Sequence, residues 1–305
     1  MTSYKLLAAT AALALVPFSA QAQTVSAVAT IGYDMTNITG IDQGLDTTSI
    51  STRASLDMGN GLSFGLNLTG IAVGIDGVPI DISALMFGVD ANYRFANGFS
   101  VGTYIENATI TTNMLPYDLA VKSYGVKFGY ETGNLDLGGF AGISETSPDV
   151  GFMGIDIRDV GVQAHYAISP RAMVGGSFVR TAISAPGTSA DVDTLGIAGA
   201  YAFNDSWSMF AGVSQTSVDL LSGDNLTTFG IGASYDLSGV LHTPASLSLE
   251  LARTQISGVS EKMDTVRLGI TFPYGNASAL PLNSVAGAVL HPRGNAVVNT
   301  LLVAF

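Results

Sequence analysis

Aromatic residues in this chain recur at one kind of position, the end of every second segment of alternating polarity, just before a tight polar turn. Phe95 precedes Ala96-Asn97-Gly98, and Tyr235 precedes Asp236-Leu237-Ser238-Gly239. Aromatic rings favour the boundary between lipid headgroups and hydrocarbon, so this spacing predicts a belt at one rim of a closed sheet. A soluble sandwich would instead bury its aromatic residues in mid-strand. The other members of the series are Tyr130, Tyr166, Phe203, Phe272 and Tyr274.

Composition supports a sheet that faces lipid. Of the 305 residues, 47% are hydrophobic and only 12% are charged, whereas about 25% are charged in an ordinary soluble domain. Beyond residue 22 there is no apolar run of about 18 residues, so no transmembrane helix is expected. The formal net charge of −12 without a basic patch excludes nucleic acid as a partner. The absence of cysteine excludes a disulfide framework.

Alternation of polarity predicts about fourteen strands between Thr24 and Tyr274. In one of these segments, Tyr124 and Val126 alternate with Gly125 and Lys127. Tight turns alternate with connections expected to be longer, such as 75–82 and 184–190, which is typical of outer-membrane barrels. The predicted fold class is therefore all-β, a transmembrane antiparallel up-and-down barrel. The segments span roughly 24–36, 47–58, 62–74, 83–95, 99–112, 121–132, 135–145, 156–169, 172–184, 191–204, 207–218, 225–237, 245–257 and 263–274.

The chain divides into three predicted parts. Lys5, the apolar stretch 6–16 and the small residues of Ala20-Gln21-Ala22 are typical of an export signal, so residues 1–22 are predicted to be a cleaved signal peptide. Residues 23–275 are predicted to form the barrel. Residues 276–305 break the alternation, and we expect this tail to lie either in the periplasm or inside the lumen.

The export signal, the alternating segments, the aromatic strand ends and the terminal Phe305 together resemble Gram-negative outer-membrane porins. Segments 229–237 and 264–272 look like porin strands of the α-proteobacterial kind. The resemblance implies a water-filled homo-oligomeric channel in the cell outer membrane, surrounded by lipid and lipopolysaccharide, that admits small hydrophilic solutes. It also implies that the outer-membrane assembly machinery reads a C-terminal aromatic residue, either Phe305 or Phe272. Two departures from the family are the short third loop, 113–120, and fourteen strands rather than sixteen.

Charged side chains at inward positions are the candidate pore-lining residues, because charge is costly at the lipid midplane and belongs in the lumen. In a wide pore they would set a transverse field and bias ion selectivity. Alternatively, they pair with neighbours and hold a packed interior together. The candidates are Arg53, Asp57, Asp90, Arg94, Glu106, Lys127, Asp136, Glu250 and Arg267.

The sequence thus predicts a porin for passive diffusion of small hydrophilic solutes, with a mild cation preference that follows from its acidic balance. One alternative is a barrel plugged by residues 276–305 that binds a ligand or partner, and another is a secreted soluble β-protein. An enzyme is not expected, because His165, His242 and His291 are the only imidazoles and none belongs to a nucleophile motif. Neither a metal cluster nor a cofactor site is predicted.

Overall fold

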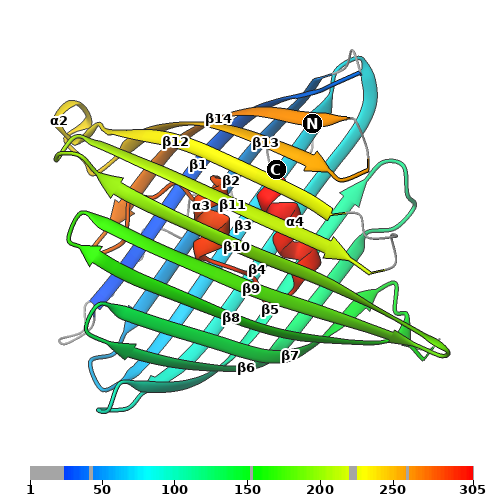
Figure 1. Cartoon of the computed structure of the whole chain (residues 1–305), viewed down its shortest axis with the longest axis horizontal. Helices are drawn as coiled ribbons and strands as arrows, with labels where there is room; N and C mark the ends of the chain where they lie inside the picture. The colour runs from blue at the N-terminus through cyan, green and yellow to red at the C-terminus, as the bar shows by residue number, and fades with distance from the viewer. Residues whose placement is uncertain (1–23, 41–43, 152–153, 220–224, 259–260, 305) are drawn as a thin grey trace.

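The computed structural model describes residues 24–40, 44–151, 154–219, 225–258 and 261–304. They form a closed antiparallel barrel, and the tail lies inside it (Figure 1). Each strand pairs with its sequence neighbours, and β1 also pairs with β14, where Ala27 lies opposite Tyr274, so the sheet has no free edge. The predicted fourteen-stranded fold is confirmed. Its strands are β1 (Thr24–Ile38), β2 (Gly44–Asp57), β3 (Leu62–Ile75), β4 (Val78–Arg94), β5 (Phe99–Thr112), β6 (Leu119–Thr132), β7 (Leu135–Ser147), β8 (Asp156–Ser169), β9 (Ala172–Ala185), β10 (Thr188–Ala202), β11 (Trp207–Val218), β12 (Asn225–Asp236), β13 (Ser246–Ile256) and β14 (Lys262–Tyr274).

The outer face of the barrel is apolar. Leu85 and Phe87 of β4 and Ile231 of β12 are exposed on it, while the residues that alternate with them along each strand point into the lumen. Aromatic rings cluster where the strands meet the tight turns, as in the pair Trp207 and Tyr235, whose ring centroids lie 4.9 Å apart. Such a surface suits hydrocarbon flanked by headgroups.

Two connections expected to be long are tight turns. β3 and β4 are joined through Asp76 and Gly77, whose φ is 72°, and β9 and β10 through Pro186 and Gly187, whose φ is 83°. The strands extend beyond the lipid-facing band, where both faces of a strand meet water. There the polarity no longer alternates strongly. For this reason the sequence pattern predicts loops at 75–82 and 184–190, where the strands in fact continue almost to the turn. The connection after β12 instead contains the short helix α2 (Ser238–Leu241).

The tail returns from the end of β14 into the lumen and forms α3 (Val285–Leu290) and α4 (Ala296–Ala304) (Figure 1). Helix α3 packs against β9 to β12. It approaches closely because the wall carries glycine there. A Cβ atom at Gly196 would lie 2.7 Å from the Val289 side chain, and one at Gly212 would lie 2.9 Å from the backbone nitrogen of Ala286.

Helix α4 packs against the opposite wall as well. Its Val298 and Leu302 join an apolar cluster with Ile71, Val73 and Met86 of β3 and β4. Among the described residues, no helix has both the length and the apolarity required to cross a bilayer. The tail helices therefore fill the lumen between two walls, and the remaining lumen space lies beside them.

Candidate functional site

Six of the nine charged residues predicted to line a pore surround one chamber of about 310 Å³. The chamber lies near the end of the barrel that carries turns 96–98 and 133–134, which we call the turn end; the opposite end is the loop end. Strands β2 and β4 to β7 position the six residues. Lys127 Nζ lies 3.3 Å from Asp90 Oδ1, and His165 Nδ1 lies 3.5 Å from Asp136 Oδ2. The six residues are Arg53, Asp90, Arg94, Glu106, Lys127 and Asp136.

The tail supplies the other side of this chamber through the segment between α3 and α4. The Gly294 N–H donates to Glu106 Oε2 at 2.7 Å, and Arg293 Nη2 donates to Thr69 Oγ1 at 3.1 Å. With Arg293 included, the described lining carries four basic and three acidic side chains, apart from the histidines. Opposite charges therefore face each other across the chamber in nearly balanced numbers.

A much smaller void, which we call the constriction, adjoins the chamber on the side of the longer loops. It has a volume of about 10 Å³ and lies where Glu106 and Arg293 meet Ala108, Val121 and Val298. A void of this size holds about one water molecule. The last three residues also line a cleft of about 420 Å³ that continues toward the loop end. The small void thus shares lining residues with the chamber on one side and with the cleft on the other, all three along β5 and β6.

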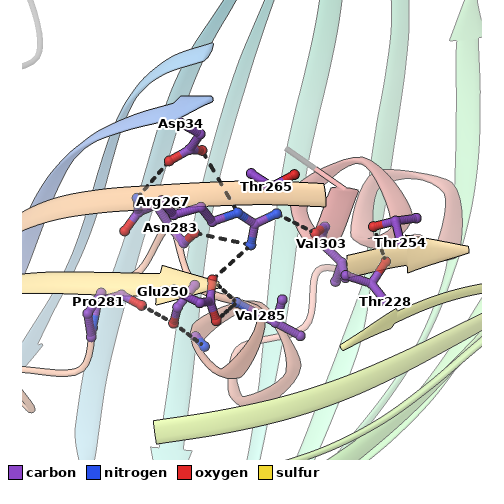
Figure 2. Close-up of polar contacts among 12 residues, drawn as sticks. Asp34, Thr228, Glu250, Thr254, Thr265, Arg267, Pro281, Asn283, Val285 and Val303 are labelled. Atoms are coloured by element: carbon purple, nitrogen blue, oxygen red, sulfur yellow. Dashed lines mark hydrogen bonds and ion pairs between the residues drawn. The ribbon is translucent and has the colours of Figure 1, made fainter. Parts of the chain in front are cut away.

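The remaining inward charges, Glu250 of β13 and Arg267 of β14, fasten the tail to the wall (Figure 2). Arg267 Nη1 donates to Glu250 Oε2 at 3.2 Å and Nη2 donates to the Val303 carbonyl at 2.8 Å. Glu250 Oε1 accepts from the Val285 N–H at 3.1 Å. The side chains of both charged residues are 2% exposed. They point inward, as alternation predicts, but the tail covers them, so they contact protein rather than lumen water.

Asp34 of β1 completes this arrangement. Its Oδ2 lies 4.0 Å from Arg267 Nε, and its Oδ1 accepts a hydrogen bond of 3.4 Å from Asn283 Nδ2 of the tail (Figure 2). We call Asp34, Glu250, Arg267 and Asn283 the latch. One guanidinium thus binds the Glu250 carboxylate and a tail carbonyl directly and lies near the second buried carboxyl group, that of Asp34.

A second anchor holds the start of α4. Asp159 of β8 is fully buried, and its Oδ1 accepts from Asn295 Nδ2 at 3.0 Å and from Thr181 Oγ1 at 2.6 Å. Thr181 Oγ1 in turn accepts from the Ala296 N–H at 2.9 Å. Buried hydrogen bonds therefore hold the N-terminal end of α4 to β8 and β9.

The other predicted site residues lie away from these groups. Asp57 is exposed at the turn end, where its Oδ1 accepts from the Gly59 N–H at 2.8 Å. Phe272 lies on the outer face near the end of β14 and is 38% exposed. Phe305 falls outside the described residues.

Two histidines, His165 and His291, lie close together beside the chamber. His165 Nε2 lies 2.9 Å from the Leu290 carbonyl oxygen, and its ring lies 6.2 Å from that of His291. Burial, together with the positive charge of Arg53, lowers the pKa of the His291 imidazole well below its usual range, so this ring is neutral at neutral pH. Within the described residues, no group of three or more His, Asp or Glu side chains is placed to hold a metal ion.

Sequence reasoning missed Asp34, Asp159 and Arg293. Alternation in β1 places Asp34 on the inward face with Thr30 and Thr36, so extending the pattern to this strand would have found it. Alternation along β8 likewise places Asp159 on the inward face. Arg293 lies in the non-alternating tail, where no periodic signal identifies a face.

Comparisons with known proteins agree with this architecture. The family model described as Gram-negative porin matches residues 87–255. Among solved structures, the anion-selective porin from Comamonas acidovorans aligns over 83% of this chain and 100% of its own, with 11% identity and a TM-score of 0.53. A Pseudomonas aeruginosa FadL homologue aligns over 82% and 90%, with 12% identity and a TM-score of 0.55. OmpT of Vibrio cholerae aligns over 84% and 99%, with 12% identity and a TM-score of 0.50. These likenesses show the fold, and a search of curated proteins returns no match.

Proposed function

Because the chain belongs to the Gram-negative porin family, we propose that small hydrophilic solutes cross its lumen passively along a path beside the tail. Family membership places the barrel in the outer membrane, where its apolar face contacts lipid. The path runs from the loop-end cleft through the constriction at Glu106 and Arg293 into the charged chamber. The observation that carries this proposal is the convergence of six inward charges from five strands on that one chamber.

Refolded full-length protein in liposomes should therefore admit only small solutes. With a constriction that holds about one water molecule, we expect swelling in glycerol or urea that is much faster than in a disaccharide. The measurement is light scattering after an isotonic solute shift, with protein-free liposomes as the control. Equal rates for the two solute sizes, or rates no faster than in empty liposomes, would contradict the proposed path.

We further propose a mild cation preference. The net charge of −12 attracts cations toward the barrel as a whole, whereas the nearly balanced charges of the chamber keep the preference weak. Outer acidic side chains such as Asp76 and Asp81 belong to the loop end. The preference thus arises from the protein's overall field and is adjusted at the constriction.

Two charge-removing substitutions at the constriction should move the selectivity in opposite directions. A charge about 4 Å from an ion in water contributes about 1 kcal/mol, with opposite sign for K⁺ and Cl⁻. Arg293→Gln should therefore raise the ratio of K⁺ to Cl⁻ permeability by up to about thirtyfold, and Glu106→Gln should lower it similarly. Reversal potentials in a planar bilayer under a KCl gradient measure this ratio. Asp57→Asn, outside the chamber, is the matched control and should leave it unchanged. If both substitutions shift the potential in the same direction, ions do not pass between these side chains.

The remaining features of this proposal concern biogenesis. Residues 1–22 act as a cleaved export signal, and the outer-membrane assembly machinery recognises an aromatic residue near the C-terminus, Phe305 or Phe272. Residues 23–275 are the barrel and residues 276–305 the tail segment. The barrel contacts lipopolysaccharide and forms a homo-oligomer, and it carries no catalytic function.

A second candidate function is a barrel that the tail plugs and that binds a ligand or partner with little conduction. The burial of the tail favours it, because Val285, Ala286 and Leu290 have no exposed surface. The two candidates differ in how much current the intact protein carries compared with a protein that lacks the tail.

A further inference from the structure

The loop-end cleft differs chemically from the chamber below it. It has a volume of about 420 Å³ and lies between α4 and strands β5 to β7. Ile110, Leu119 and Val121 come from the wall, and Val297 and Leu301 come from the helix. None of the described side chains that line it is charged. A solute that enters from the loop end therefore meets an apolar surface before it reaches the charges.

This apolar wall departs from the pattern of the barrel. Much of the inward face carries small or hydroxyl side chains, such as Ser49 and Ser51 of β2, and the apolar inward residues of β3 and β4 are covered by α4. By contrast, Leu119 and Val297 face the cleft, and each is 40% exposed. Exposed apolar surface away from lipid is unfavourable in water and marks a surface that an apolar partner would cover.

Docking of the tail creates the cleft. Val298, Leu301 and Leu302 of α4 pack against the cluster on β3 and β4, and Val303 belongs to the cluster with α3. Val297 lines the cleft, as do Val298 and Leu301, and Ile110 of β5 lines it from the wall. The latch and the Asp159 anchor fix the helix in this position, so the two sides of the cleft are held apart by structure already formed.

We propose that this cleft binds a small, uncharged hydrophobic molecule from the loop side of the barrel. Its volume lies within the range of small-molecule sites, which are mostly apolar and largely preformed. A charged molecule would lose hydration there without gaining a partner. The cleft is lined by inward residues of the strands, by α4 and by the loop residues Tyr117 and Val150, so its occupant is a dissolved small molecule rather than a lipid of the surrounding bilayer. Binding does not require passage through the constriction, although the cleft is also the loop-end entrance of the proposed permeation path.

The single tryptophan of the chain allows a direct binding test. Trp207 is exposed on the outer face at the turn end, so its fluorescence reports a probe that partitions into lipid. A reporter in the cleft is provided by Tyr117→Trp combined with Trp207→Phe. The probe is 6-bromohexan-1-ol, whose bromine quenches tryptophan on contact. With protein in lipid nanodiscs, we expect saturable quenching of the reporter at position 117 and only a linear, shallower decrease for Trp207 in the unmodified protein.

Substitutions then locate the site. In the reporter background, Leu119→Ser and Val297→Ser should each weaken the apparent affinity about fivefold, because each removes apolar contact surface. Val240→Ser, on exposed helix α2 at the turn end, should leave it unchanged. Coincident quenching curves for the two reporters, or affinities unaffected by both cleft substitutions, would overturn the inference. Protein that conducts ions but shows no saturable quenching refutes the binding site alone, and saturable quenching without conductance refutes the permeation path alone.

Discussion

A chain that ends at residue 275 should conduct about ten times more current than the full-length protein, because the tail helices occupy lumen space that would otherwise be part of a wide aqueous channel. In the full-length protein the proposed path passes a void of about 10 Å³ that Arg293 and Val298 of the tail help to line. Removal of the tail also deletes α3, which contacts strands β9 to β12. Closure of the barrel depends on the pairing of β1 with β14 and not on the tail, so the shortened barrel should retain its strand content. Single-channel recording of refolded protein measures the change, and circular dichroism verifies the fold.

A locked tail is the matched control for this experiment. A Cβ atom at Gly196 would lie 3.3 Å from the Val289 Cβ, close to the separation found in disulfides. The double variant Gly196→Cys with Val289→Cys should therefore form a cross-link, and the absence of native cysteine rules out mispairing. The oxidised protein should conduct like the wild type. Unchanged conductance after truncation would show that the tail does not limit permeation, whereas lower conductance after cross-linking would show that the tail leaves the lumen in the working channel.

Arg267→Met should release the tail, because it leaves two carboxylates, Glu250 and Asp34, buried without their cation. Breaking a buried ion pair from one side costs about 3–5 kcal/mol. The substitution also removes the donor to the Val303 carbonyl. We expect a lower unfolding temperature, faster proteolysis within residues 276–304 and a larger conductance. Thermal unfolding and limited proteolysis in detergent report the first two effects.

The same substitution on the adjacent strand provides the comparison. Arg253 of β13 pairs with Asp264 at 2.6 Å, but both side chains are about half exposed. Arg253→Met should therefore cost no more than about 1 kcal/mol and leave the tail protected. Adding Glu250→Gln to Arg267→Met removes one of the two uncompensated charges and should recover part of the lost stability. Equal effects of the two arginine substitutions would mean that burial under the tail contributes nothing to the latch.

Much of the barrel could be predicted because lipid and water act on each strand residue separately. Phe87 and Ile231 face hydrocarbon, and their neighbours along each strand face the lumen. Polarity therefore alternates with a period of two along the chain. The same parity predicts that Arg53, Glu106 and Lys127 lie on the inward face. The pattern was less informative at 75–82 and 184–190, because polarity ceases to alternate where a strand extends into water on both sides.

The strand number, the two faces of the sheet and the inward direction of its charges therefore follow from the pattern of polarity along the chain. What each inward charge contacts depends on how the closed barrel and its tail fit together. Alternation treats Lys127 and Arg267 alike, yet one lines the chamber and the other lies beneath the tail, 2% exposed. The difference arises because residues 34, 250, 267 and 283 come together only after the barrel has closed and the chain beyond β14 has turned back into it. Contacts between such distant segments leave no period in the sequence, since they depend on how a non-repeating tail fits the space that the inward glycines of β10 and β11 leave free.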